Sequence, residues 1–116
     1  MTDQQQQTLD DLKKQYDTLN TQLPEVMRAD SQFTKDDKNQ FVMALNTALG
    51  NLLTAQNGIL EQDNDTVQHI DDAAQGAQKT LDRMLNDLTG LSSKIGIITS
   101  ALNTVSTALS IIKPIV

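Results

Sequence analysis

The sequence predicts an all-α protein, a single antiparallel four-helix bundle with up-down-up-down topology. Three observations support this class: a helical spacing of apolar residues, a shortage of aromatic residues, and turn or capping residues between the periodic segments. A chain of 116 residues with 38% hydrophobic content is long enough for one core and too short for two. Its only aromatic residues are Tyr16, Phe33 and Phe41. The core must therefore be aliphatic, which is typical of packed helices rather than of β-sheets.

Apolar residues recur at alternating steps of three and four in four segments, a spacing that keeps them on one helical face. The register breaks between segments, so we expect separate helices near 4–28, 34–61, 65–89 and 92–113. One bundle domain over 1–116, with 1–7 frayed, is the simplest arrangement, and a helical hairpin that pairs with a second copy is the main alternative. The periodic positions are Leu9, Leu12, Tyr16, Leu19, Leu23, Val26, Phe41, Leu45, Ala48, Leu52, Ala55, Ile59, Val67, Ile70, Ala74, Ala77, Leu81, Met84, Leu88, Leu91, Ile95, Ile98, Leu102, Val105, Leu109 and Ile112.

The first two helices have boundary signals in the sequence. Pro24 lacks a backbone donor and crowds the preceding turn, so the first helix should end or kink there. Thr34 and Asp37 have the spacing of a capping box, which predicts the start of the second helix. Asn57-Gly58 should weaken the end of that helix.

The last two helices are bounded in the same way. Asp65 with Gln68 can cap the third helix, and Thr89-Gly90 is a plausible stop because glycine accepts the left-handed conformation. Ser92 or Ser93 can then open the fourth helix. The short connections on either side of the third helix favour antiparallel neighbours.

Composition and charge exclude several classes of function. The net charge is −6, and all fifteen acidic residues precede Gly90, after which only Lys94 and Lys113 are charged. Without a cluster of Lys and Arg, we expect no nucleic-acid partner. The chain has no cysteine and hence no thiolate chemistry. Residues 1–8 lack the pattern of a signal peptide, so we expect a cytoplasmic protein, with leaderless export as the alternative.

Candidate metal and acid–base residues are few, and we expect no catalytic, cofactor or metal site and no enzymatic activity. His69 is the only histidine, and no Glu-x-x-His motif accompanies it, so we expect a solvent-facing structural residue. The segment 61–72 resembles a calcium loop, but Thr66 stands where the loop needs glycine. An acidic helix start is the better interpretation. The adjacent carboxylates Asp10-Asp11, Asp36-Asp37 and Asp71-Asp72 should diverge on their helices and be solvated.

The fourth segment has unusual chemistry, because 95–112 contains no charged residue. It is too polar to span a membrane alone. A solvated face usually carries Lys and Glu, as we expect in the first three segments. Here an apolar flank lies beside the periodic positions, and a stripe of small, neutral residues lies opposite. The predicted partner-binding residues are Gly96, Ile97, Ser100, Ala101, Asn103, Thr107, Ala108, Ser110, Ile111 and Ile115.

These observations favour a non-catalytic interaction module, such as an adaptor, an inhibitor or immunity-type protein, or a secretion-associated protein. It would bind a protein partner or a second copy through the fourth helix, and its acidic body would suit a basic partner. One alternative is that the fourth helix is simply the most buried of the four. A second is a membrane-active protein that inserts its C-terminal helical hairpin into or onto lipid. A bundle that holds a metal or cofactor is the third.

Overall fold

The computed structural model describes residues 1–112, and its elements form a four-helix bundle. The helices are α1 (Asp3–Met27), α2 (Lys35–Gly58), α3 (Asn64–Leu85) and α4 (Leu91–Leu109), with a 3-10 turn, η1 (Ile59–Glu61), after α2. The predicted all-α class is confirmed. Four helices of one chain complete the core, so the hairpin that requires a second copy is not the arrangement adopted.

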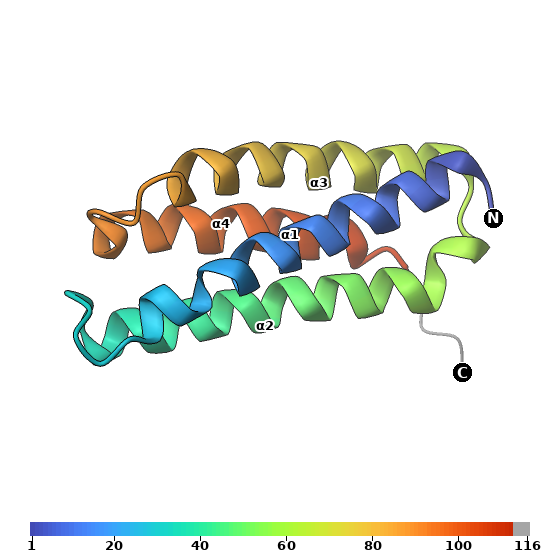
Figure 1. The fold of residues 1–116 in the computed structure, drawn as a ribbon. Coiled ribbons are helices and arrows are strands. Elements are labelled where there is room, and N and C mark those ends of the chain that lie inside the picture. The colour runs from blue at the N-terminus through green and yellow to red at the C-terminus, as the bar shows by residue number, and fades with distance from the viewer. Residues whose placement is uncertain (113–116) are drawn as a thin grey trace.

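The helices alternate in direction along the bundle, as Figure 1 shows. α1 packs against α2 and α3, and α4 packs against the same two helices. The α1·α2 and α3·α4 pairs are therefore antiparallel neighbours, whereas α1·α3 and α2·α4 are parallel neighbours. α2 and α3 lie across a diagonal, joined by η1 and the turn that follows it. α2 and α3 are antiparallel, as their short connection predicts, but the prediction that they are neighbours is wrong because the connection crosses the bundle.

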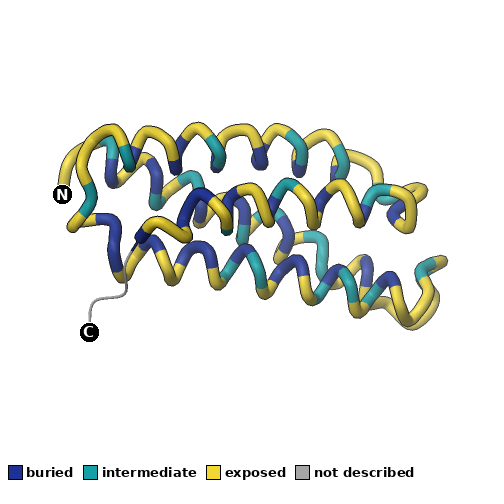
Figure 2. Tube along the Cα trace, turned by 180° about the vertical axis from the view of Figure 1, so that it is seen from behind, coloured by how far each residue is buried: buried dark blue, intermediate teal, exposed yellow. Residues whose placement is uncertain are grey.

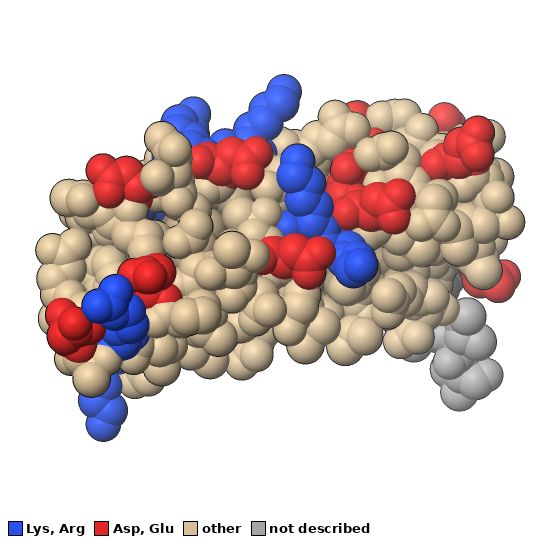
Figure 3. All heavy atoms as spheres, viewed as in Figure 1, with Lys and Arg blue, Asp and Glu red and all other residues tan. Residues whose placement is uncertain are grey.

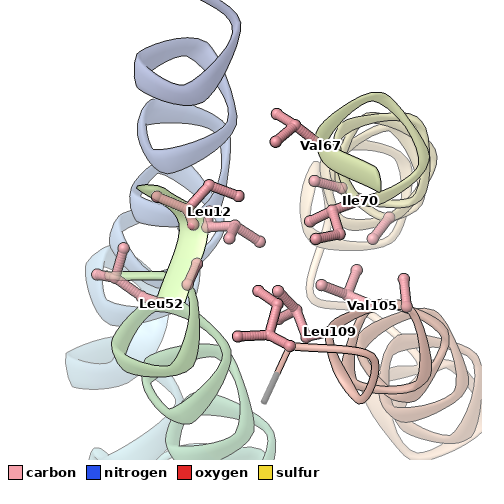
Figure 4. Close-up of a cluster of buried hydrophobic side chains, with 12 residues drawn as sticks. Leu12, Leu52, Val67, Ile70, Val105 and Leu109 are labelled. Atoms are coloured by element: carbon pink, nitrogen blue, oxygen red, sulfur yellow. The ribbon is translucent and has the colours of Figure 1, made fainter. Parts of the chain in front are cut away.

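The predicted periodic positions form the core. Of the twenty-six, twenty-one are buried and five are partly buried. Figure 2 shows the buried positions recurring along the inner face of each helix. In Figure 4, Leu12 of α1 and Ile70 of α3 lie near Val105 and Leu109 of α4, and Leu52 of α2 belongs to the same buried cluster. A second cluster around Phe41 fills the other half of the bundle. Burial of these aliphatic side chains is the main force that holds the helices together.

α1 matches the predicted range 4–28 within one residue at each end, but two details differ from the prediction. Thr2 and Gln5 form a capping box, so residues 1–7 are not frayed. Gln5 is also buried, and its Nε2 donates to the Ile59 carbonyl at 3.3 Å. The helix continues through Pro24 to Met27 instead of ending at the proline. Pro24 lies near the end of α1, where the one backbone hydrogen bond it removes does not stop the helix.

The cap of α2 is as predicted, and that of α3 is not. Thr34 accepts from the Asp37 amide at 3.1 Å, while Asp37 accepts from the Thr34 amide at 3.2 Å. The α3 cap is Asp63 rather than Asp65, because Asp63 Oδ1 accepts from the Thr66 amide at 2.8 Å. The predicted 34–61 helix is divided at Gly58, where η1 takes over.

The connection between α3 and α4 is longer than predicted. α3 ends at Leu85, and the Gly90 stop belongs instead to the start of α4. Gly90 has φ +74°, the left-handed conformation expected of it, and directly precedes Leu91. Neither Ser92 nor Ser93 is the cap of α4. α4 ends at Leu109, and position 113 of the predicted range lies outside the described residues.

Candidate interaction surface

The outer face of α4 is exposed, as a binding surface must be. Ile97 and Ile111 are 47% and 49% exposed. The other exposed members of the predicted set are Gly96, Ser100, Asn103, Thr107 and Ser110. The structure thus brings seven of the ten predicted residues together on one solvent-facing surface. α4 is not a helix buried on all sides.

The remaining three predicted residues do not join this exposed face. Ala108 is only 5% exposed and belongs to the core cluster that contains Val105 and Leu109. Contrary to the expectation of an exposed residue, Ala108 is covered by the bundle itself. Ala101 is partly buried against the same cluster, so only its edge can reach a partner. Ile115 lies outside the described residues.

A buried amide fixes α4 against α2. Asn51 of α2 is 6% exposed, and its Nδ2 donates to the Leu102 carbonyl at 3.2 Å. Its Oδ1 accepts from the Ser106 hydroxyl at 2.8 Å. An amide held from both ends in a helical interface specifies one register, because any slip leaves its donor and acceptor unpaired. The outer face of α4 is therefore presented in one fixed orientation.

A second polar contact holds the start of α4. The Ser92 hydroxyl donates to Asp37 Oδ2 at 2.6 Å, at the capped end of α2. This hydrogen bond lowers the pKa of Asp37, since it stabilises the charged form, and the bonds from Thr34 act in the same direction against partial desolvation. The parallel helices α2 and α4 are thus joined by polar contacts at their starts and near their middles.

A shallow trough follows the boundary between α3 and α4. It consists of two adjoining depressions of about 360 and 300 Å³, which share Thr80, Ala101 and Thr104. Small residues, among them Gly76 and Gly96, line much of the remainder. The lining is mostly small and hydroxyl-bearing, with Asp72 as its one charged residue, and such a shallow surface suits contact with another surface.

α2 shares the uncharged character of α4, contrary to prediction. We expected charged residues on the outer faces of the first three helices, but none occurs from Asn39 to Leu60, a run of twenty-two residues. This run is longer than the uncharged 95–112 segment and was visible in the sequence. Its importance depends on the packing of α2 beside α4, which the sequence did not predict.

The two uncharged runs form one continuous surface, which we call the neutral side. It comprises the exposed residues of 39–60 and 95–112. Of seven exposed large hydrophobic residues among 1–112, five belong to these two runs: Met43, Leu53, Leu60, Ile97 and Ile111. Met43 lies on the flank of α2 beside α4, whereas Leu53 lies about 200° around α2 from Asn51 and Ile97 lies at the boundary with α3. In Figure 3 the charged side chains gather over α1 and α3 and at the loop end, while α2 is uncharged along most of its length. Apolar groups and missing charge thus coincide on the same helices.

The α1·α3 side carries the charge and contains an unexpected carboxyl pair. Asp71 is only 2% exposed, and its Oδ2 accepts from Gln75 at 2.8 Å and from Gln4 at 3.4 Å. Burial raises the pKa of Asp71 to about 6, helped by a hydrogen bond to Asp11 and by its negative charge. The prediction that both residues are solvated is wrong, because α1 and α3 pack together at this point.

The other predicted polar residues have the following positions. His69 is exposed, as expected, and so are Asp10, Asp36 and Asp72. Asp37 is buried at 7% exposure, contrary to expectation, because it caps α2 beneath the start of α4. The segment that resembles a calcium loop is the capped start of α3. Residues 1–112 contain no group of three or more carboxylate or histidine side chains placed to hold a metal ion.

Across the described helices, none combines the length and the apolar character required to cross a lipid bilayer. Compared with known proteins, the chain matches no protein-family model, no curated protein and no solved structure.

Proposed function

We propose that this protein is a non-catalytic interaction module that binds a protein partner or a second copy through the outer face of α4. One observation carries the proposal: an uncharged helical face is exposed to water and held in a fixed orientation. Ile97 and Ile111 are about half exposed on it, and their removal from water would favour association. The cores of protein interfaces are similarly depleted of charged residues.

The small residues of this face support close contact. Gly96 and Ser100 leave room for a neighbouring backbone, and the hydroxyls and amide of Thr107, Ser110 and Asn103 can form hydrogen bonds across an interface. Burying such groups leaves no unpaired charge in the interface. A buried unpaired charge would have the largest unfavourable desolvation free energy. The face is thus suited to desolvation.

The charge of the other helices supports a role in partner choice. α1 carries five acidic and two basic residues, and α3 four acidic and two basic. Acidic flanks would attract a partner with a basic rim and repel acidic ones, which affects association rate and specificity more than affinity. Adaptors, inhibitors, immunity-type proteins and secretion-associated proteins all fit this description.

Membrane activity has less support from the same surface. Helices that lie in a lipid interface usually carry Lys and Arg beside their apolar stripe. The outer face of α4 instead carries Ser, Thr and Asn, and the neighbouring α3 is acidic and would be repelled by anionic lipids. We therefore propose protein contact as the function.

The test introduces charge on the proposed surface. In the α4 variant, Ser100→Glu and Thr107→Glu would place two carboxylates where a partner must exclude water. The control variant, Thr21→Glu with Gln68→Glu, adds the same charge to exposed positions of α1 and α3. Both should keep the wild-type far-UV circular dichroism spectrum, since all four positions are exposed.

The readout is the set of proteins that co-purify from the native host, together with self-association of the purified chain. We expect a species retained by wild type and control to be lost by the α4 variant. If the α4 variant retains every partner and every self-contact of the wild type, the proposed function is wrong.

A further inference from the structure

We infer that a second copy of this chain docks on the neutral side, so that two bundles pack with α2 and α4 inward. This inference rests on the proposed function and makes it more specific, because it names the partner and extends the surface from α4 to α2.

The charge distribution favours a copy of the same chain over a charged partner. The neutral side offers no ion pair to a basic or an acidic surface, but it matches another neutral surface. Two copies with net charge −6 repel each other, and the repulsion is least when the acidic α1·α3 sides point away from each other. Contact through α2 and α4 produces that orientation, because α1 and α3 lie on the opposite side of the bundle.

The area is close to that of a stable dimer interface. α4 has 19 residues, which at the helical rise give a length of about 28 Å. Two packed helices are about 20 Å wide, so the flat footprint is roughly 600 Å². The accessible area of a surface with protruding side chains such as Met43 and Ile97 exceeds its flat footprint. It therefore approaches the roughly 800 Å² per partner of a standard interface.

At two glycines on the neutral side, no contact within the bundle requires the absence of a side chain. Gly50 lies in α2 and Gly96 in α4, both helical and exposed, and a Cβ at either would meet nothing within 4 Å. A glycine inside a helix destabilises it by about 0.5–1 kcal/mol relative to alanine. Close approach of a second backbone would give these glycines a function that the isolated bundle does not.

The α2 side of this surface can be placed from its hydrogen bonds. Asn51 contacts α4, and helical spacing puts Met43, Thr47, Gly50 and Thr54 on the adjoining outer flank. This flank lies beside the exposed residues of α4, since the two helices are parallel and packed. Charges introduced here test α2 without altering α4.

The first experiment is sedimentation equilibrium of the full chain from low-micromolar to near-millimolar concentration. We expect a monomer–dimer equilibrium for the wild type and for the Thr21→Glu, Gln68→Glu control. Met43→Glu with Thr54→Glu should weaken dimerisation at least about 100-fold, because a two-fold interface would bury four like charges. A wild type that stays monomeric, or an α2 variant that dimerises like the control, overturns the inference.

The second experiment uses alanine in place of glycine. Gly50→Ala and Gly96→Ala should each raise the melting temperature of the dilute monomer and yet weaken dimerisation several-fold. Gly76→Ala is the matched control, since Gly76 is helical, exposed and open but lies on α3. It should raise the melting temperature and leave dimerisation unchanged. Equal effects of all three substitutions on dimerisation would contradict close backbone contact at the neutral side.

The dependence of binding on salt and the binding to lipid vesicles distinguish a second copy from a basic protein partner and from a membrane. The dissociation constant of a dimer with outward acidic sides should fall with added sodium chloride, because salt screens the repulsion between the two copies. The dissociation constant of a complex between the acidic sides and a basic protein should rise instead, because salt screens the attraction. A monomeric wild type that floats with vesicles of phosphatidylcholine and phosphatidylglycerol would identify lipid as the occupant and overturn the inference. A monomer that still loses a co-purified partner in the Ser100→Glu, Thr107→Glu variant would overturn only the dimer, leaving the proposed function in place.

Discussion

At the scale of single residues, the most informative side chains are the polar ones that the core encloses. Asp71 lies close enough to Asp11 for a shared hydrogen bond to raise its pKa, and Asp11 Oδ2 and Asp71 Oδ1 are buried without a hydrogen-bond donor among residues 1–112. Two carboxyls can share such a bond only when one of them holds a proton. Asn51 is satisfied at both ends and needs no proton. The carboxyl pair is therefore sensitive to pH, whereas the amide contact is not.

The carboxyl pair predicts how stability varies with pH. The pKa of Asp71 is about 6 in the folded chain, against an ordinary value of 3.8. The native state therefore binds more protons than the unfolded state between these values, and this contribution to stability is lost as pH rises through about 6. Asp71→Asn should stabilise the protein at pH above 7 by on the order of 2 kcal/mol, because the amide can donate to Asp11 without a proton.

Urea unfolding of wild type and Asp71→Asn, at acidic and at neutral pH, measures this effect. The gain should shrink toward pH 4, where Asp71 is protonated in the native state. Asp72→Asn is the control, because Asp72 is the neighbouring carboxylate and is exposed. A gain of equal size at both pH values, or an equal gain in the control, would contradict the shared proton.

At the scale of helices, two glycines of the α4 region differ in why glycine is present. Gly90 is required by its backbone conformation, whereas nothing inside the bundle requires Gly96. Gly90 precedes α4 with φ +74°, a conformation in which an L side chain is strained. Gly96 lies six residues further on, within α4, in regular helical geometry and with open space around it. The same substitution should thus have opposite effects at two positions six residues apart.

We predict that Gly90→Ala destabilises the protein by about 1 kcal/mol, from the left-handed conformation. Gly96→Ala should instead stabilise the dilute monomer by about 0.5–1 kcal/mol, from helix propensity. Thermal unfolding followed by circular dichroism at low protein concentration measures both. Destabilisation by Gly96→Ala would show that a contact within the bundle requires the glycine there.

At the scale of the whole molecule, the dominant feature is the segregation of charge. α1 and α3 are parallel neighbours, and acidic residues exceed basic ones on both. α2 and α4 are also parallel neighbours and are uncharged over 39–60 and 95–112. The bundle therefore has one side that repels itself and another that gains from leaving water.

This segregation predicts a response of stability to salt. At neutral pH, raising sodium chloride from low to physiological concentration should raise the melting temperature by a few degrees, because it screens repulsion along the α1·α3 side. At pH 4.4, the isoelectric point, the net charge vanishes and the response should nearly disappear. Calorimetry at both pH values checks this, and equal responses would point to a general effect of salt on burial instead.

Much of the fold could be predicted from the sequence, for a local reason. Whether a segment is helical and which face it buries depend on residues three and four positions apart, so the spacing of apolar residues such as Leu102 and Val105 was sufficient. The Thr34 cap and the left-handed Gly90 are local in the same way. The end of α3 at Leu85 was missed, because short polar connections have weak local signals.

The candidate surface was predicted only in part. The exposed face of α4 followed from its composition, but Ala108 was placed on the wrong side of the boundary between flank and core. A few tens of degrees around a helix decide whether such an alanine touches a partner or a neighbouring helix, and that depends on how α3 packs. The contribution of α2 was missed because its uncharged run gains meaning only beside α4.

The sequence by itself determined the helical class, the four buried faces and the uncharged character of two segments, because each depends on the order of residues along one helix. Only the tertiary structure decided which helices are neighbours. The α2–α3 connection crosses a diagonal, so α2 lies beside α4 and α1 beside α3. That choice joins two uncharged segments into one surface and brings Asp11 to Asp71. It depends on how side chains distant in sequence fit together, which no local pattern encodes.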